Sequence, residues 1–254
     1  MKKIAALFLG LLFITNVIYA QGSAGSAATQ EARYIFNLPS AGTLERGSYA
    51  IEGLIFSGGG VLAAMSVGIS NDLTFGISYG AGNVVGSGDP VWNKLPGVMV
   101  RYRIIPEDLF FPAITLGFDS QGRGNYIDSL GRYERKSAGF FAAASKNLEF
   151  LGFLTLHGGV NYSLETRDDR DANFYVGLEK TIGPQVTIYS QYDFAFNDNS
   201  PSALGTGRGF WDAGLRWSVG SGITLELNLS NLSNNFKDIG AATRSVRLEY
   251  INTF

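Results

Sequence analysis

The sequence predicts an all-β protein that forms a single transmembrane, antiparallel, up-and-down β-barrel. Three observations support this prediction. Twelve similar segments recur along the chain, and most of them alternate apolar and polar residues with a period of two, which is typical of strands with one apolar and one polar face. The links between these segments are alternately short and long, as in barrels with turns at one end and loops at the other. After residue 20, no run of about 18 apolar residues occurs, so a membrane-spanning helix is not expected.

Composition excludes several classes of function. The chain has 254 residues, including 33 Gly, 18 Phe and 12 Tyr, and it has no Cys. Charged residues make up 17% of the chain, and the formal net charge is −2. Because no cluster of Lys and Arg stands out, nucleic acid is not an expected partner. Without Cys the fold has no disulfide, even in an exported protein. No motif for a metal or a cofactor is present, so none is expected.

The N-terminal region predicts three parts of the chain. Residues 1–20 have the pattern of a cleaved secretory signal peptide: two lysines, an apolar run and then Ala20. The alternative is an uncleaved anchor, but the apolar run is shorter than the ~20 residues that a spanning helix needs. Residues 21–46 predict a periplasmic leader, and a position of this leader inside the lumen as a plug is left open. Residues 47–254 are predicted to form the outer-membrane barrel.

Alternation is plainest near the C-terminus of the chain. Between residues 223 and 230, Ile223, Leu225, Leu227 and Leu229 alternate with polar residues such as Glu226. In the first, fifth and sixth segments both parities carry apolar residues, so the facing of those strands is ambiguous. The predicted strands are residues 48–56, 61–70, 73–82, 97–105, 109–118, 138–146, 152–164, 172–181, 185–195, 210–219, 223–230 and 244–254.

The links decide between a membrane barrel and a soluble β-sandwich. Short turns are predicted around residues 71–72, 106–108, 183–184 and 220–222. The links in between are mostly long, at residues 83–96, 119–137, 165–171, 196–209 and 231–243. Short periplasmic turns and long extracellular loops are typical of outer-membrane barrels. A sandwich is the alternative, but it does not explain this regular alternation.

Aromatic residues on the apolar parity are predicted to lie at the two membrane interfaces. Trp211 and Trp217 lie on one face of the same strand, roughly 20 Å apart at ~3.3 Å per residue. The predicted interface residues are Tyr79, Tyr102, Tyr162, Trp211, Trp217, Tyr250 and Phe254.

The opposite parity faces the lumen and carries charges of both signs. Because the signs nearly balance, a strongly anion-selective channel is not expected. Arginine pairs with carboxylates in a fixed geometry, so we expect Glu226 to lie between Arg216 and Arg247 in a constricted lumen. Inward glycines such as Gly177 are attributed to curvature and lumen space rather than to a ligand channel. The predicted charge network comprises Arg101, Arg103, Glu179, Asp193, Asp212, Arg216, Glu226, Arg247 and Glu249.

His157 is the only histidine and therefore the only candidate for a histidine base. A nucleophilic serine needs a histidine within hydrogen-bond reach, and Ser145 on the neighbouring strand could supply it, with Asn161 as the orienting residue. No motif marks these residues, so a structural, lumen-facing histidine is the prediction and no catalytic residue is assigned.

An acidic loop around Asp168, Asp169 and Asp171 offers oxygen ligands for a divalent cation. Arg167 and Arg170 dilute its charge, and its spacing fits no calcium loop. The sequence therefore predicts a solvated loop rather than a metal site.

The C-terminal segment, SVRLEYINTF, alternates apolar residues and ends on Phe254. It resembles the targeting strand of bacterial outer-membrane barrels, which their assembly machinery recognises. The resemblance implies a location in the outer membrane, with the lipid bilayer, lipopolysaccharide and the barrel-assembly machinery as partners.

Two other stretches are similar to the pattern of YjbH-like proteins, a family of outer-membrane β-barrels associated with exopolysaccharide production and export. They are NLPSAGTLERGSY and PAITLGFDSQGRGNY, the second continuing to FFAAASKN. The resemblance implies a polysaccharide as a partner. The matching positions are Asn37, Pro39, Ser40, Ala41, Pro112, Ala113, Leu116, Gly117, Asp119, Gly122, Gly124, Ser145 and Lys146.

Together these observations predict a non-enzymatic outer-membrane barrel. It would be a YjbH-like surface or export component, or a narrow pore for saccharide or small solutes. The alternative is a structural or adhesive barrel that acts through its extracellular loops, residues 119–137 in particular. A third hypothesis is an enzyme centred on His157.

Overall fold

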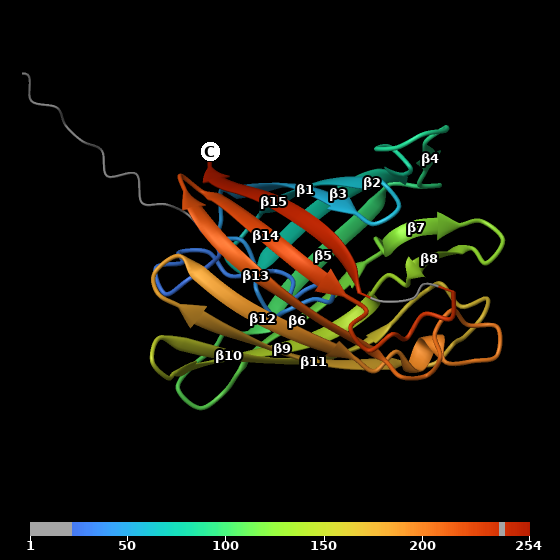
Figure 1. Ribbon diagram of the computed structural model, residues 1–254. Helices are drawn as coiled ribbons and strands as arrows, with labels where there is room; N and C mark the ends of the chain where they lie inside the picture. The colour runs from blue at the N-terminus through green and yellow to red at the C-terminus, as the bar shows by residue number, and fades with distance from the viewer. Residues whose placement is uncertain (1–21, 239–241) are drawn as a thin grey trace, which may run out of the picture.

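The computed structural model describes residues 22–238 and 242–254 (Figure 1). The predicted signal peptide, residues 1–20, lies outside the described residues. Within them, twelve strands form a closed antiparallel barrel, which confirms the predicted fold class. The strands of the ring are β1 (Ser48–Phe56), β2 (Gly60–Gly68), β3 (Leu73–Gly82), β5 (Gly97–Ile105), β6 (Ala113–Asp119), β9 (Gly139–Glu149), β10 (Phe153–Tyr162), β11 (Asn173–Ile182), β12 (Val186–Asp193), β13 (Phe210–Gly220), β14 (Ile223–Ser230) and β15 (Thr243–Thr253).

The first and last strands close the ring. Strand β1 pairs with β15 in a register that runs from Ser48 opposite Thr253 to Ile55 opposite Val246. The remaining strands pair with their neighbours in the chain, so the ring has up-and-down topology. Closure pairs the backbone of β1 with that of β15, so neither strand leaves an unpaired edge.

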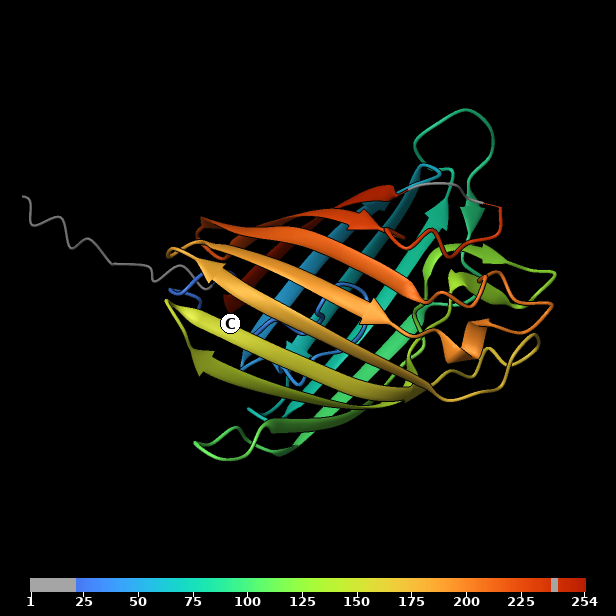
Figure 2. The ribbon, with the colours of Figure 1, turned by 60° about the horizontal axis from the view of Figure 1, so that its bottom comes forward.

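The barrel has two different ends (Figure 2). Short turns and the C-terminus lie at one end, which we call the short-turn end. The long connections gather at the other, which we call the long-loop end. Additional elements lie at the long-loop end: strand β4 (Val91–Trp92), the hairpin of β7 (Arg123–Ile127) and β8 (Arg132–Arg135), and the 3-10 turn η1 (Phe196–Asp198). These elements are too short for periodicity to reveal them.

The predicted strand over residues 109–118 was wrong at its start. Strand β6 begins at Ala113, and residues 109–111 belong to a turn. The Asp108 carboxylate accepts hydrogen bonds from the Phe110 and Phe111 amides, both at 2.7 Å. Pro112 follows and has no amide proton to donate to a neighbouring strand. An Asp-initiated turn therefore outweighs the apolar run that suggested a longer strand.

The two faces of the wall have opposite chemistry. In β14, Leu227 and Leu229 are half exposed on the outside, whereas Thr224, Glu226 and Asn228 are buried on the inside. This is the reverse of a soluble protein and suits a barrel whose outer face contacts lipid. No helix among the described residues is long and apolar enough to cross a membrane.

The predicted interface aromatics lie on the outer face. Trp217 is paired with Val186 near the short-turn end, and Trp211 is paired with Tyr192 near the long-loop end. At the short-turn end, Tyr250 and Phe254 pack around Tyr49, with ring centroids 6.2 and 5.0 Å from its ring. The role of these side chains as membrane anchors stays a prediction; Tyr79, Tyr102 and Tyr162 are likewise exposed.

A buried ionic cluster holds the long loops together. The Arg132 guanidinium lies 2.5 Å from Asp168 and 2.6 Å from Asp198, and the Lys136 ammonium lies 2.7 Å from Asp168. Asp168 was expected to be solvated, but its side chain is only 1% exposed. That prediction was wrong because the partners come from segments 30 or more residues distant in the chain, which a local charge pattern does not reveal.

Acid is expected to open this cluster. Burial alone would raise the pKa of the Asp168 carboxyl, but hydrogen bonds from Lys136 and Arg132 outweigh it and hold that pKa below its usual value of 3.8. A lowered carboxyl pKa stabilises the folded loops above the usual value, and this contribution is lost as pH falls through the folded pKa. A spin label on Ser129→Cys, at the tip of the β7–β8 hairpin, should gain mobility below pH 3.8.

Two variants complete that experiment. Asp168→Asn should leave the label mobile at neutral pH, whereas Asp171→Asn, which removes an exposed carboxylate from the same loop, should leave the acid transition in place. A label whose mobility ignores both pH and Asp168 would contradict the structural role of the cluster.

Candidate functional site

The lumen is occupied by the chain's own N-terminal segment. Residues 22–46, which we call the inner segment, run as an irregular chain inside the ring of strands (Figures 1 and 2). Ile35, Phe36 and Leu38 are almost completely buried. Ile35 and Leu38 belong to an apolar cluster with the inward-facing Phe141 and Tyr175 of the wall.

Arginines of the wall donate hydrogen bonds to backbone carbonyls of the inner segment. Each buried backbone carbonyl needs a hydrogen-bond donor, and an irregular segment provides few backbone amides that can bond its own carbonyls. These arginines, Arg101, Arg216 and Arg247, are at most 4% exposed. The contacts are Arg101 to Arg33 and Gly42 at 2.6 and 3.0 Å, Arg216 to Tyr34 and Ile35 at 3.1 Å each, and Arg247 to Phe36 at 3.0 Å.

Uncharged wall residues accept from the backbone amides of the same segment. The Gln191 Oε1 atom accepts from three consecutive amides, those of residues 36–38, at 3.0 to 3.3 Å. Ser145 accepts from the Ala41 amide at 2.9 Å, and Thr74 accepts from the Leu44 amide at 2.9 Å. The wall therefore pairs with both kinds of backbone group along the inner segment.

Ion pairs between side chains also join the inner segment to the wall. Arg33 of the inner segment, itself 2% exposed, pairs with Glu52 and lies 2.5 Å from Glu249. Glu31 pairs with Arg103 of the wall. Arg33 and Glu31 were absent from the predicted lumen network because they lie outside the strands. No alternation of apolar and polar residues there predicts which side chains point into the lumen.

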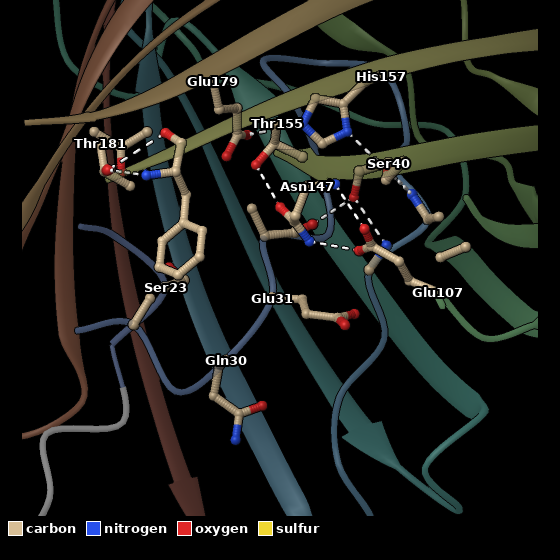
Figure 3. A pocket seen from close by; sticks show the side chains of 18 of the residues that line it. Ser23, Gln30, Glu31, Ser40, Glu107, Asn147, Thr155, His157, Glu179 and Thr181 are labelled. Atoms are coloured by element: carbon tan, nitrogen blue, oxygen red, sulfur yellow. Dashed lines mark hydrogen bonds and ion pairs between the residues drawn. The ribbon is translucent and has the colours of Figure 1, made fainter. Parts of the chain in front are cut away.

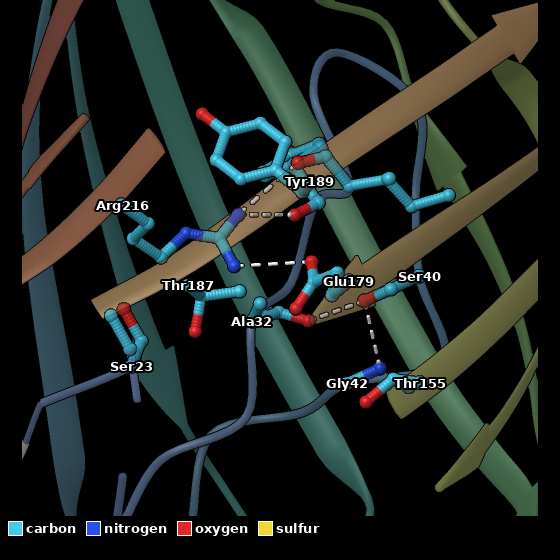
Figure 4. Close-up of polar contacts among 12 residues, drawn as sticks. Ser23, Ala32, Ser40, Gly42, Thr155, Glu179, Thr187, Tyr189 and Arg216 are labelled. Carbon is cyan, nitrogen blue, oxygen red and sulfur yellow. Dashed lines mark hydrogen bonds and ion pairs between the residues drawn. The ribbon is translucent and has the colours of Figure 1, made fainter. Parts of the chain in front are cut away.

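Within the wall, Glu226 lies between two arginines. Its carboxylate is 2.8 Å from Arg216 and 3.0 Å from Arg247. Arg216 also lies 3.1 Å from Glu179, a contact that Figure 4 shows. The four side chains come from β11, β13, β14 and β15. A carboxylate that bridges two guanidinium groups balances charges that would be costly to bury alone.

The structure does not bring the other predicted lumen charges into one network. Asp212 pairs with Arg135 of strand β8 at 2.6 Å. Asp193 accepts from the Asn173 side chain at 2.8 Å and from the Ala195 amide at 3.0 Å. Arg101, Arg103 and Glu249 contact the inner segment. The lumen charges therefore divide among a wall network, the inner segment and the long loops.

Ser145, His157 and Glu179 meet on neighbouring strands, but their geometry differs from that of a catalytic triad. His157 Nδ1 lies 2.8 Å from the Ser145 hydroxyl, and Nε2 lies 3.8 Å from Glu179. The serine oxygen already accepts from the inner segment, and Arg216 holds Glu179. Asn161 takes no part, since it donates to the Ala138 carbonyl. These contacts suit a structural histidine that links the wall to the inner segment.

A cavity of about 280 Å³ lies between the inner segment and the wall near the short-turn end (Figure 3). Its wall residues include Glu107, Thr155, His157 and Glu179, and the inner segment contributes Gln30 among others. Three cavities nearer the long loops hold only about 30, 50 and 10 Å³, which is room for a few water molecules.

No metal site is evident in the part of the chain that the structure describes, where no group of three or more His, Cys, Asp or Glu residues could hold an ion. Two of the three carboxylates of the acidic loop, those of Asp168 and Asp169, have partners within the protein. Asp169, for example, accepts from the Asn199 and Ser200 amides at 3.2 and 3.1 Å.

Comparison with known proteins places the fold among outer-membrane porins. No family model and no curated protein matches the sequence. Among solved structures, the "KdgM porin" superposes with a TM-score of 0.51 at 9% identity, over 82% of this chain and 99% of that one. The Acinetobacter baumannii outer membrane protein Omp33 gives 0.44 at 9% identity, over 83% and 99%. The chain is a closed 12-stranded barrel, and its fold is similar to that of the KdgM porin.

Removal of Glu226 is expected to destabilise the barrel. Glu226→Ala leaves Arg216 and Arg247 buried without their shared carboxylate, a change that typically costs about 3–5 kcal/mol. The free energy of unfolding in urea, measured on refolded protein in detergent, tests this. Glu45→Ala is the matched control because Glu45 is exposed. Equal stability of the two variants would contradict the network.

Proposed function

We propose that the protein is a narrow outer-membrane pore for saccharides or other small solutes, closed by the inner segment acting as a plug. The observation that carries the proposal is the hydrogen bonding of wall arginines to the carbonyls of residues 33–36 and 42. A lumen side chain that pairs with an internal peptide is poorly placed to contact a passing solute. The contacts therefore favour a pore that conducts only when the segment moves.

The barrel fold supports the pore part of the proposal, since the structure superposed above carries the name porin. The similarity to YjbH-like proteins favours a saccharide as the solute and an export role, and it remains the basis for that finer assignment. In this proposal the short-turn end faces the periplasm, and the outer apolar face contacts lipid and lipopolysaccharide. The barrel-assembly machinery recognises the C-terminal strand.

The charges that line the lumen favour a weakly selective pathway. Glu226, Arg216 and Arg247 compensate one another, as do Arg33 and its two carboxylate partners. Strong ion selectivity generally needs a lining of one sign. A neutral solute fits this balanced lining better than a polyanion.

Single-channel conductance in a planar bilayer tests the proposal. The full chain should be closed for most of a recording, whereas protein lacking residues 22–46 should give steady conductance. Arg33→Ala should open intermittently, because Glu52 and Glu249 would lose the cation that ties the segment to the wall. Arg46→Ala, which removes an exposed cation from the same segment, is the matched control and should stay closed.

A folded barrel without residues 22–46 that passes no current would contradict the pore. A structural or adhesive barrel would then be the favoured function. The ordered long loops around Arg132 would be the first surface to test for a partner.

A further inference from the structure

We propose that Glu52 and Glu249 form a binding site for a small organic cation that carries N–H donors, either a primary amine or a guanidinium. In the closed protein, Arg33 of the inner segment occupies this site. A solute of that class displaces Arg33 and so opens the pore. The binding site stands on the geometry of the two carboxylates, whereas its effect on the pore rests on the function proposed above.

The two carboxylates face each other across the strand pair that closes the barrel. Glu52 of β1 is the register partner of Glu249 of β15, and each residue is 8% exposed on the inner side of the wall. Two like charges directly opposite on one face of a sheet destabilise the strand pairing. A buried carboxylate also needs a cation or hydrogen bonds to offset the loss of water. Closure of the barrel therefore creates a position that favours a cation.

One nitrogen atom pairs with both carboxylates. Arg33 Nη2 pairs with Glu52 and lies 2.5 Å from Oε1 of Glu249. The other two guanidinium nitrogens of Arg33, Nε and Nη1, have no hydrogen-bond partner among the described residues. Recognition therefore depends on the N–H groups of a single cationic nitrogen and does not need the planar fork of a guanidinium.

This geometry defines the class of ligand. An alkylammonium ion has one cationic nitrogen with three N–H donors, so it can pair with both carboxylates as Arg33 does. A guanidinium ion can do the same with one of its nitrogens. A quaternary ammonium ion has the same charge but no N–H group, so it cannot donate to either carboxylate.

The cation that occupies the site belongs to the part of the protein that moves in the proposed function. Ser23 of the same segment also donates to Oε2 of Glu249, at 2.6 Å. When residues 22–46 leave the lumen, the two carboxylates lose Arg33 and Ser23 together. The charge balance described above thus holds for the closed lumen, and opening leaves an acidic position beside the β1–β15 pair.

Two other arginines border the same small cavity as Glu52, namely Arg123 and Arg247. Arg247 is held by Glu226 at 3.0 Å, and Arg123 belongs to the β7–β8 hairpin. In the part of the chain that the structure describes, neither forms an ion pair with Glu52 or Glu249. An incoming cation therefore meets two carboxylates whose ion-pair partner has left with the inner segment.

Displacement of Arg33 couples binding to opening. The position between the two carboxylates holds either Arg33 or the solute. A ligand that binds only after the inner segment has moved shifts the equilibrium toward the open state. A cation with N–H donors should therefore open the pore, whereas a quaternary ammonium ion should leave it closed.

Arg33→Ala tests the site directly, because it empties the position between the carboxylates and keeps the inner segment. The probes are methylammonium, guanidinium and tetramethylammonium chlorides, with the total salt concentration held constant. Binding to the full chain in detergent is measured by isothermal titration calorimetry. Methylammonium and guanidinium should bind at least about tenfold more tightly than tetramethylammonium, which cannot donate a hydrogen bond.

Matched variants separate the site from general attraction between cations and acidic groups. Adding Glu249→Gln to Arg33→Ala should weaken methylammonium binding at least about tenfold. Arg33→Lys, which keeps one cationic nitrogen, should bind the probes no more tightly than the unaltered chain. Arg46→Ala removes an exposed cation from the same segment and should also match the unaltered chain. If Arg33→Ala binds no probe or binds all three equally, or if Glu249→Gln leaves the affinity unchanged, the site is overturned.

Conductance of the unaltered chain tests the coupling to opening. Methylammonium at about ten times its Kd for Arg33→Ala should raise the ratio of open to closed time about tenfold. Tetramethylammonium at the same concentration should leave that ratio unchanged. If Arg33→Ala does not refold, a titration of the unaltered chain with both ions decides the proposal, and equal effects of the two ions would overturn it.

The site and the function beneath it can fail separately. If protein lacking residues 22–46 passes no current but Arg33→Ala binds methylammonium selectively, the pore falls and the site stands. If the shortened protein conducts but Arg33→Ala binds no probe, the pore stands and the site falls. If both hold but methylammonium does not open the unaltered chain, displacement of Arg33 by a solute is overturned.

Discussion

Backbone hydrogen bonding inside the lumen is the constraint on which the rest of the structure depends. A peptide without regular structure that enters a barrel loses water from its amides and carbonyls, and each needs a new partner. The wall supplies these partners from fixed positions: guanidinium groups for carbonyls, and Gln191, Ser145 and Thr74 for amides. Hydrogen bonds to charged groups contribute about 1.5–3 kcal/mol each, so several together hold a segment that has no intrinsic preference for this conformation.

The same constraint explains why the lumen arginines have their particular neighbours. A guanidinium group has five donors, enough for a carboxylate and a peptide carbonyl at once. Arg216 donates to Glu226, to Glu179 and to the carbonyls of Tyr34 and Ile35. A lysine could not present this planar set of donors. The charge network and the seating of the inner segment are therefore one arrangement.

The strands were predictable from sequence because their signal is local, whereas the site was not. Alternation in a segment such as residues 223–230 indicates that one face of the strand is apolar and the other lines a polar lumen. It also identifies Glu226, Arg216 and Arg247 as inward. The fit of the inner segment depends on contacts between residues more than 100 positions apart, such as Tyr175 with Pro39. The apolar run of Tyr34, Ile35 and Phe36 within a polar leader was the only hint.

Glycine 177 shows how the wall accommodates the inner segment. A Cβ atom placed there would lie 2.7 Å from Ile35 Cγ2, so the absence of a side chain allows close approach. Sequence alone suggested barrel curvature and lumen space for this residue. The structure indicates that it also provides space for a specific side chain of the inner segment.

That close approach provides the most direct test of the central claim, that residues 22–46 lie inside the barrel. The chain has no cysteine of its own, so Ile35→Cys combined with Gly177→Cys creates a single possible disulfide. Oxidation of the folded protein in outer-membrane vesicles should join the two positions and block both thiols from a water-soluble maleimide. Two thiols that stay unjoined and react freely would show that the segment lies elsewhere and would contradict the account.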